Sequence, residues 1–239
     1  MKPTTRNFQV VAFDLDDTLY PEGQFVHSGF GAVARWADRQ LGISEPIGLA
    51  ELQRYFEAGI RERVFDLWLE EHDLPPDPWV PVMVQVYRNH VPRIELYPGA
   101  RECLVHQRTV GRQIGLVTEG YAGVQRAKIH ALALEALLDV VVITDENSRK
   151  EWKPSPHPFQ QLVEGTRAVP ERILYVGDNP AKDFQGARGL GIATVRMRVS
   201  GGLHSSEDPL SPSQAADWEV ASFPQLEELL EGTPPIGGP

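Results

Sequence analysis

Five short apolar runs recur along this chain, and stretches of helical periodicity lie between them. The runs are residues 9–13, 113–117, 140–143, 172–176 and 193–197. Each is rich in strand-forming residues, and most are apolar throughout instead of alternating with polar residues. Strands of this kind are buried on both faces. Their alternation with helices therefore predicts an α/β fold built on a doubly wound parallel sheet.

The segments between and after these strands show the period of helices or the composition of loops. Helices are predicted at residues 101–108, 122–134, 158–165, 181–190 and 223–230. Residues 199–217 are rich in Ser, Gly and Pro, which predicts a long loop before the last helix. Three glycines, Gly186, Gly189 and Gly191, precede a predicted strand instead of following one. That is the wrong context for a dinucleotide-binding loop, so they are interpreted as the end of a helix.

One long segment, from about residue 20 to 96, interrupts the alternation and contains no convincing strand. Apolar residues at helical spacing predict helices through Phe30, Val33, Ala34 and Ala37, through Leu52, Tyr55, Phe56, Gly59 and Ile60, through Val64, Leu67 and Trp68, and over residues 80–90. A Pro-rich stretch at 74–78 separates the last two. We therefore expect residues 1–20 and 96–232 to form the core, residues 21–95 to form an inserted all-helical subdomain, and residues 233–239 to be a flexible tail.

Composition narrows the classes of partner. The chain has 239 residues with 41% apolar and 23% charged side chains, enough for a sizeable core without disulfides or structural metals. Its formal net charge is -10 and its pI is about 5.2, which argues against a nucleic-acid-binding surface. A small anionic substrate would need a few placed cations or a metal ion to bind to so acidic a protein.

The single cysteine, Cys103, cannot form an internal disulfide, which fits a reducing compartment. No apolar run reaches membrane-spanning length, and none resembles a signal peptide. We therefore expect a cytoplasmic protein with no membrane partner.

Polar side chains end three of the predicted strands. Asp14 follows the first, Thr118 the second and Asp178 the fourth. In an open parallel sheet, ligands bind beyond the carboxyl ends of the strands, where the strand order reverses. The sequence therefore predicts that these three side chains meet at one edge of the sheet.

Four motifs, in this order, carry a resemblance to a known family. They are Asp14-Leu15-Asp16-Asp17-Thr18, Thr118-Glu119-Gly120, Lys153-Pro154-Ser155-Pro156, and Gly177-Asp178 followed by Asp183. The set resembles the haloacid dehalogenase-like (HAD) superfamily over about residues 9–197. The resemblance implies a Rossmann-like core, and the helical insert falls where this superfamily places its cap.

The resemblance also implies roles for these residues. Asp14 would be the nucleophile that forms an aspartyl-phosphate, and Asp16 the general acid and base. Magnesium (Mg2+) would be held by the Asp14 carboxylate, the Asp16 backbone carbonyl and the Asp178 carboxylate, since oxygen-only ligands suit this ion. Asp183 would act behind the metal ligands or be purely structural.

The remaining motif residues would bind the phosphoryl group. The resemblance gives Thr118 a hydroxyl donor role, Lys153 a positive charge, and the backbone amide of residue 119 a contact with phosphate. Glu119 departs from the family, which commonly has a small polar residue or an aspartate there. Its acid could face away from the site or add negative charge that narrows the substrate range. Asp17 is expected to orient a loop rather than to catalyse.

Together these features predict a magnesium-dependent phosphatase that hydrolyses a small phosphorylated metabolite. A 2-haloacid dehalogenase uses the same nucleophile but lacks the acid two residues later and needs no metal, so Asp16 argues against it. A phosphomutase or phosphotransferase would retain both acids. A non-catalytic binding module is a different class, but it would be expected to lose the nucleophile or the metal aspartate. The substrate, the inward-facing residues of the insert and the oligomeric state stay open.

Overall fold

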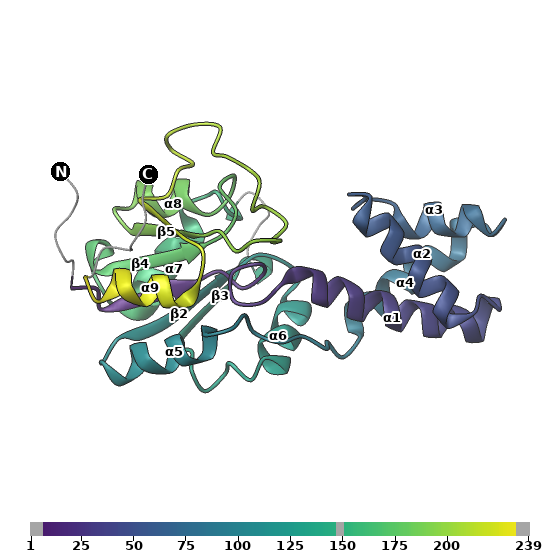
Figure 1. The fold of residues 1–239 in the computed structure, drawn as a ribbon, viewed down its shortest axis with the longest axis horizontal. Coiled ribbons are helices and arrows are strands. Elements are labelled where there is room, and N and C mark those ends of the chain that lie inside the picture. Colours follow the sequence, from purple (N-terminus) through teal and green to yellow (C-terminus); the bar gives the residue numbers. More distant parts are fainter. Residues whose placement is uncertain (1–6, 147–150, 233–239) are drawn as a thin grey trace. The chain divides into compact units, whose positions relative to one another are not determined.

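The computed structural model describes residues 7–146 and 151–232 (Figure 1). These residues form two compact units. One runs up to Glu22 and resumes at Glu95, and the other spans Gly23–Ile94. The predicted tail at 233–239 lies outside the described residues. No helix in the described ranges is both long and apolar enough to cross a membrane.

The first unit is built on a six-stranded sheet in the order β3-β2-β1-β4-β5-β6, and every neighbouring pair is parallel. The strands are β1 (Val10–Phe13), β2 (Gln113–Thr118), β3 (Val140–Ile143), β4 (Ile173–Gly177), β5 (Ala193–Met197) and β6 (Trp218–Val220). The first five agree with the predicted strands to within one residue, which confirms the α/β fold class. The sixth was missed because three residues are too few to show a period.

Helices cover both faces of this sheet (Figure 1). They are α5 (Ala100–Thr109), α6 (Ala122–Ala131), α7 (His157–Thr166), α8 (Phe184–Gly189) and α9 (Phe223–Leu230), with short 3-10 helices at Thr144–Glu146 and Pro170–Arg172. Two predicted boundaries were wrong. Helix α6 ends before residue 134 because Ala133 adopts a positive φ of 48°. Helix α8 starts at Phe184 rather than at 181 because the Asn179 side chain accepts a hydrogen bond from the Ala181 amide and holds a turn there.

Alternation along the central strand explains the two layers. Val10 and Ala12 point to the face covered by α7, where they pack in one core cluster with Phe159 and Leu162. Phe13 points to the opposite face of the sheet, where the centre of its ring lies 6.5 Å from that of Phe223 on α9. Since successive side chains of a strand point to opposite faces, an apolar run needs helices on both sides.

The strand order places β1 at the point where the chain changes direction across the sheet. From β1 the chain adds β2 and then β3 on one side, and it returns to add β4, β5 and β6 on the other. The carboxyl end of β1 is therefore flanked by those of β2 and β4, which is where an open parallel sheet binds ligands.

The second unit is helical throughout. It contains α1 (Glu22–Leu41, which begins at the last residue of the first unit), α2 (Glu45–Glu57), α3 (Val64–Glu71) and α4 (Pro76–Asn89). The predicted apolar stripes supply its core, in which Phe30, Val33, Ala37, Leu52, Trp68 and Met83 are buried. Gly59 and Ile60 were wrongly assigned to a helix. Helix α2 stops at Glu57, and Gly59 adopts a left-handed φ of 80°.

The three glycines near β5 mark the end of a helix, as predicted. Gly186 and Gly189 lie in α8, and Gly191 follows it with φ of 89°. Gly186 also has a packing role. A Cβ atom there would lie 2.6 Å from the carbonyl oxygen of Pro154 and 2.7 Å from that of Ser155, whereas a Cβ atom at Gly189 would meet nothing within 4 Å.

The matched substitutions Gly186→Ala and Gly189→Ala test this packing. We expect Gly186→Ala to lower the free energy of unfolding by about 1–3 kcal/mol, because backbone carbonyls cannot rotate out of the way as a side chain can. Gly189→Ala should be neutral or stabilise by up to about 1 kcal/mol through helix propensity. Urea unfolding of both variants measures the difference, and equal effects would contradict the packing role of Gly186.

Candidate active site

Asp14 directly extends the central strand. Its backbone amide donates to the Val176 carbonyl at 2.8 Å, so the β1–β4 pairing continues through the first residue beyond β1. The side chain is buried, and its Oδ1 accepts a hydrogen bond from the Lys153 Nζ at 2.7 Å. Burial, opposed in part by the Lys153 ammonium, raises the pKa of Asp14 from 3.8 to about 7. The sheet thus fixes the backbone of Asp14, and Lys153 fixes its carboxylate.

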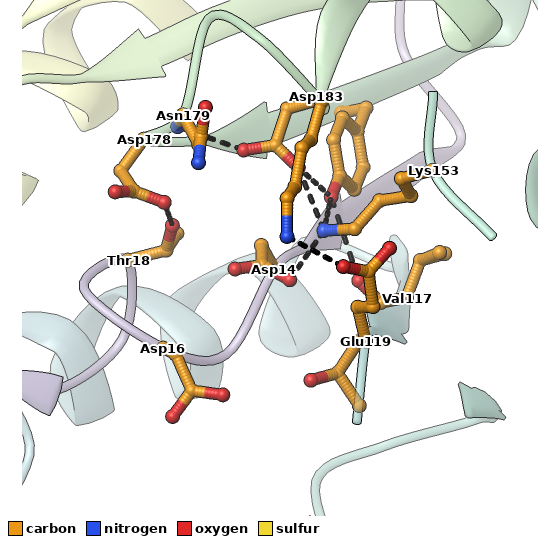
Figure 2. Close-up of polar contacts among 12 residues, drawn as sticks. Asp14, Asp16, Thr18, Val117, Glu119, Lys153, Asp178, Asn179 and Asp183 are labelled. Atoms are coloured by element: carbon orange, nitrogen blue, oxygen red, sulfur yellow. Dashed lines mark hydrogen bonds and ion pairs between the residues drawn. The ribbon is translucent and has the colours of Figure 1, made fainter. Parts of the chain in front are cut away.

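Lys153 joins two of the predicted acids. Besides Asp14 it donates to Asp183 Oδ1 at 2.7 Å and to the Tyr175 hydroxyl at 3.2 Å, and it is itself buried (Figure 2). Burial alone would lower the pKa of Lys153, but the charges of Asp14 and Asp183 hold it well above its ordinary value. Lys153 is therefore a cation throughout the physiological range.

Asp183 is packed behind this pair. Its Oδ1 accepts from Lys153 and, at 3.1 Å, from the Tyr175 hydroxyl, while its Oδ2 accepts from the Asn179 amide at 2.8 Å. Gly177 makes room for it, because a Cβ atom at that position would lie 2.6 Å from the Asp183 carboxylate. The pairing of Gly177 with a later aspartate in the fourth motif thus has a steric cause.

Asp178 follows β4 and lies across from Asp14. It is buried, and its Oδ1 accepts from the Thr18 hydroxyl at 3.4 Å. Burial and then the charges of Asp183 and Asp14 raise the pKa of Asp178 to about 9. Carboxylate oxygens of Asp14, Asp178 and Asp183 all lie within 4.8 Å of one another, so a cation could be held among them.

Asp16 occupies a different environment from Asp14. Its Oδ1 accepts from the Lys128 Nζ at 2.7 Å, its Oδ2 accepts from the Gln125 Nε2 at 2.9 Å, and the Tyr20 hydroxyl also donates to it. Burial opposes ionisation of Asp16, but the Lys128 charge and these hydrogen bonds lower its pKa below 3.8. Lys128 and Gln125 were missed at the sequence level. Two polar residues three apart on a buried helix face were the available signal.

Of the two polar residues of the second motif, Glu119 lines the pocket and Thr118 does not. Thr118 is fully buried, and its hydroxyl oxygen accepts from the Gln125 amide. Glu119 lines the pocket and forms an ion pair with Lys182 at 2.6 Å, while its Oε2 is buried with no hydrogen-bond partner within the described part of the chain. Lys182 therefore offsets the negative charge that Glu119 brings.

The pocket formed by these groups lies wholly within the first unit. It is lined by Asp14, Asp16, Asp17, Glu22, Glu119, Lys153, Asp178, Asn179, Lys182, Asp183 and His204. Of the site residues expected from the sequence, all but Thr118 are in this lining. Glu22 was not foreseen; burial and the neighbouring Asp16 charge raise its pKa to about 7.

The loop after β5 is attached to the site by two charged residues. Asp17, at a left-handed φ of 51°, accepts from the Glu22 amide and from the Leu203 amide, each at 2.9 Å. Arg196 is buried and donates to the carbonyls of Asp178 at 3.2 Å, His204 at 2.8 Å and Glu207 at 2.7 Å. Asp17 thus orients loops, as predicted, and Arg196 is a supporting residue that sequence reasoning did not find.

Comparison with known proteins agrees with this geometry. The family model of haloacid dehalogenase-like hydrolases matches residues 11–197. The chain is 29% identical to a glyceraldehyde 3-phosphate phosphatase from Methanopyrus kandleri, over 89% of this chain and 92% of that protein.

Solved structures show the same fold. A HAD-hydrolase from Bacillus subtilis, bound to magnesium, superposes with a TM-score of 0.68 at 18% identity, covering 94% of this chain and 99% of that one. A 2-haloacid dehalogenase from Pseudomonas syringae does so with a TM-score of 0.63 at 20% identity, covering 94% of this chain and 98% of that one. The fold therefore does not by itself separate phosphatases from dehalogenases. The family model and the phosphatase relative from Methanopyrus kandleri supply the evidence that the fold lacks. They show that the chain belongs to the haloacid dehalogenase-like hydrolase family and is an enzyme of its phosphatase type.

Proposed function

We propose that this protein hydrolyses a small phosphate monoester with magnesium, through an aspartyl-phosphate on Asp14. The observation that carries the proposal is the shared placement of Asp14, Asp178 and Lys153. Two buried acids whose carboxylate oxygens approach within 4.8 Å lie beside a buried ammonium that contacts one of them at 2.7 Å. The two acids suit a cation, and the ammonium together with that cation suits a phosphoryl group, so the site is arranged to bind both at once.

The residues fit magnesium by their chemistry. Only oxygen ligands are offered, which suits magnesium. Burial, and after it the charges of neighbouring acids, raises the pKa values of Asp14 and Asp178, and a bound cation would oppose both effects. Asp183 is less suited to direct contact, because both of its oxygens already accept hydrogen bonds. We therefore assign the ion to Asp14, Asp178 and the Asp16 backbone carbonyl, with Asp183 holding Lys153. When bound, the ion would neutralise charge on the phosphoryl oxygens and keep both acids ionised.

In the first half-reaction an Asp14 carboxylate oxygen attacks phosphorus in line. Because Lys128 lowers its pKa, Asp16 is ionised in the free protein and takes up a proton as the negatively charged phosphate binds beside it. The bond from phosphorus to the ester oxygen then breaks, and the Asp16 carboxyl gives that proton to the ester oxygen, so the leaving group departs as an alcohol. Lys153 stays beside Asp14 and the transferred phosphoryl group. The products are the free alcohol, the aspartyl-phosphate and an ionised Asp16.

In the second half-reaction Asp16 takes a proton from a water molecule as that water attacks phosphorus. The bond between phosphorus and Asp14 breaks, and inorganic phosphate leaves. Asp14 is again a carboxylate and Asp16 is again protonated, so the cycle closes without another reactant.

The alternatives differ at named residues. A dehalogenase has no use for a proton donor at Asp16 or for an acid at Asp178, and both are built into the site here. A non-catalytic module would not need to keep Asp14 and Asp178 buried beside each other against their repulsion. A phosphomutase shares both acids, and transfer of phosphate to a second alcohol instead of to water would reveal it.

The first test is turnover of p-nitrophenyl phosphate. We expect activity with magnesium, none after removal of the metal with EDTA, and a loss of about a thousandfold or more in kcat for Asp14→Asn, because the amide is not a nucleophile. Asp38→Asn, which removes an exposed carboxylate from α1, is the matched control and should keep full activity. Turnover that survives either chelation or Asp14→Asn would overturn the proposal.

The second test is the pH dependence of magnesium binding. Asp14 and Asp178 have pKa values raised to about 7 and about 9 without metal, so binding must displace protons from them. Affinity should therefore fall as the pH is lowered from 8 to 6, about tenfold per pH unit for each proton displaced. Isothermal titration calorimetry in buffers of different ionisation enthalpy measures the affinity and the proton release. A pH-independent affinity, or unchanged binding in Asp178→Asn, would contradict the assigned ligands.

A further inference from the structure

Helix α6 delivers two buried polar side chains to Asp16. Lys128 contacts one carboxylate oxygen at 2.7 Å and Gln125 contacts the other at 2.9 Å. In Figure 2 the Asp16 carboxylate points away from Asp14, while Asp14 points toward Lys153. Asp14 and Asp16 thus each contact a lysine, and the two lysines come from different parts of the chain.

The Lys128 ammonium is placed there at a cost. Its side chain is 5% exposed, whereas lysines in folded proteins almost always reach water. Burying an ammonium is unfavourable unless a carboxylate compensates it, and Asp16 does so. Gln125 is buried as well, and its amide also bonds to Thr118, so the first and second motifs share one hydrogen-bonded network.

The turn after β2 and the side chain of Tyr20 hold this network in place from opposite sides. Gly120 has φ of 141°, and a Cβ atom there would lie 3.3 Å from the Gln125 side chain, so the turn after β2 brings α6 close. Tyr20, fully buried, donates to Asp16 from the other side. Fixed groups therefore surround the Asp16 carboxyl and define its direction.

We propose that Lys128 is a positioning residue for proton transfer by Asp16. It holds the Asp16 carboxyl in place and balances the negative charge left there once the proton has moved to the leaving oxygen. The proposal rests on the proposed function, because it needs Asp16 to be the proton donor. It goes further in naming the group that makes the donor effective, and it predicts a dependence on the leaving group.

A leaving group that is stable as an anion needs no proton, and one that is unstable does. We therefore compare kcat/KM for dinitrophenyl phosphate and phenyl phosphate, since kcat/KM reports the steps up to the first irreversible one and excludes hydrolysis of the intermediate. For Lys128→Met we expect a loss of about a hundredfold on phenyl phosphate, the lower range for a general acid, and little change on dinitrophenyl phosphate. Lys128→Arg should restore part of the loss. Arg126→Met removes an exposed charge from the same helix and is the matched control, with both substrates unchanged.

A double-variant cycle separates positioning from a structural role. If Lys128 acts through Asp16, adding Lys128→Met to Asp16→Asn should cause no further selective loss on phenyl phosphate. This pair also removes both charges together, so it remains informative if Lys128→Met alone unfolds. Equal losses on the two substrates, no loss on either, or additive losses in the double variant would each overturn the proposal. Failure of the proposed function is distinguishable, because wild type would then lack magnesium-dependent turnover or Asp14→Asn would retain it.

Discussion

Electrostatic repulsion among buried carboxylates is the constraint around which this site is built. Asp14, Asp178 and Asp183 approach one another within 4.8 Å at the carboxyl edge of the sheet, out of contact with most of the water that would screen them. Such a group is stable only if protons, lysines or a metal ion compensate the charge. Lys153 does so in part by contacting Asp14 and Asp183. Burial first, and then the neighbouring acids, still raise the pKa values of Asp14 and Asp178.

The fold keeps these acids together by hydrogen bonds and close packing. Asp14 is tied to β4 through the Val176 carbonyl, Asp183 fits only because residue 177 is glycine, and Arg196 fixes the carbonyl of Asp178. The first two restraints come from β4 and the third comes from β5. Because these restraints hold the acids in place, the acids cannot move apart to relieve their repulsion. A bound cation would relieve it and would in turn attract a phosphoryl group.

Asp14 and Asp16 of the first motif have opposite surroundings. Asp14 lies among other acids and has a raised pKa, whereas Asp16 lies against Lys128, Gln125 and Tyr20 and has a lowered one. In the metal-free protein these directions are the reverse of what a nucleophile and a proton donor need, so a bound cation must ionise Asp14 and a bound phosphate must favour protonation of Asp16 before the two acids can take these roles. This separation depends on α6, which lies more than a hundred residues along the chain.

The apolar runs were sufficient to predict five strands and the fold class, because strands buried on both faces leave a simple pattern. Asp14 and Asp178 could be predicted as site residues because each directly follows such a run. Lys128 and Arg196 could not, since a charged residue inside a helix or strand is ordinarily exposed and only the tertiary packing buries it. Likewise β6 is too short to show a period, and the positive φ values of Gly59 and Ala133 ended helices that periodicity alone had extended.

Direct trapping of the intermediate tests the central claim that Asp14 carries the phosphoryl group. Borohydride reduces an acyl phosphate to an alcohol, so quenching the enzyme during turnover and reducing it should convert Asp14 to homoserine. Peptide mass spectrometry then locates the change. The account predicts homoserine at position 14 in enzyme quenched with substrate and magnesium, and none in enzyme without substrate. Modification at another residue, or an unmodified Asp14 during steady turnover, would contradict it.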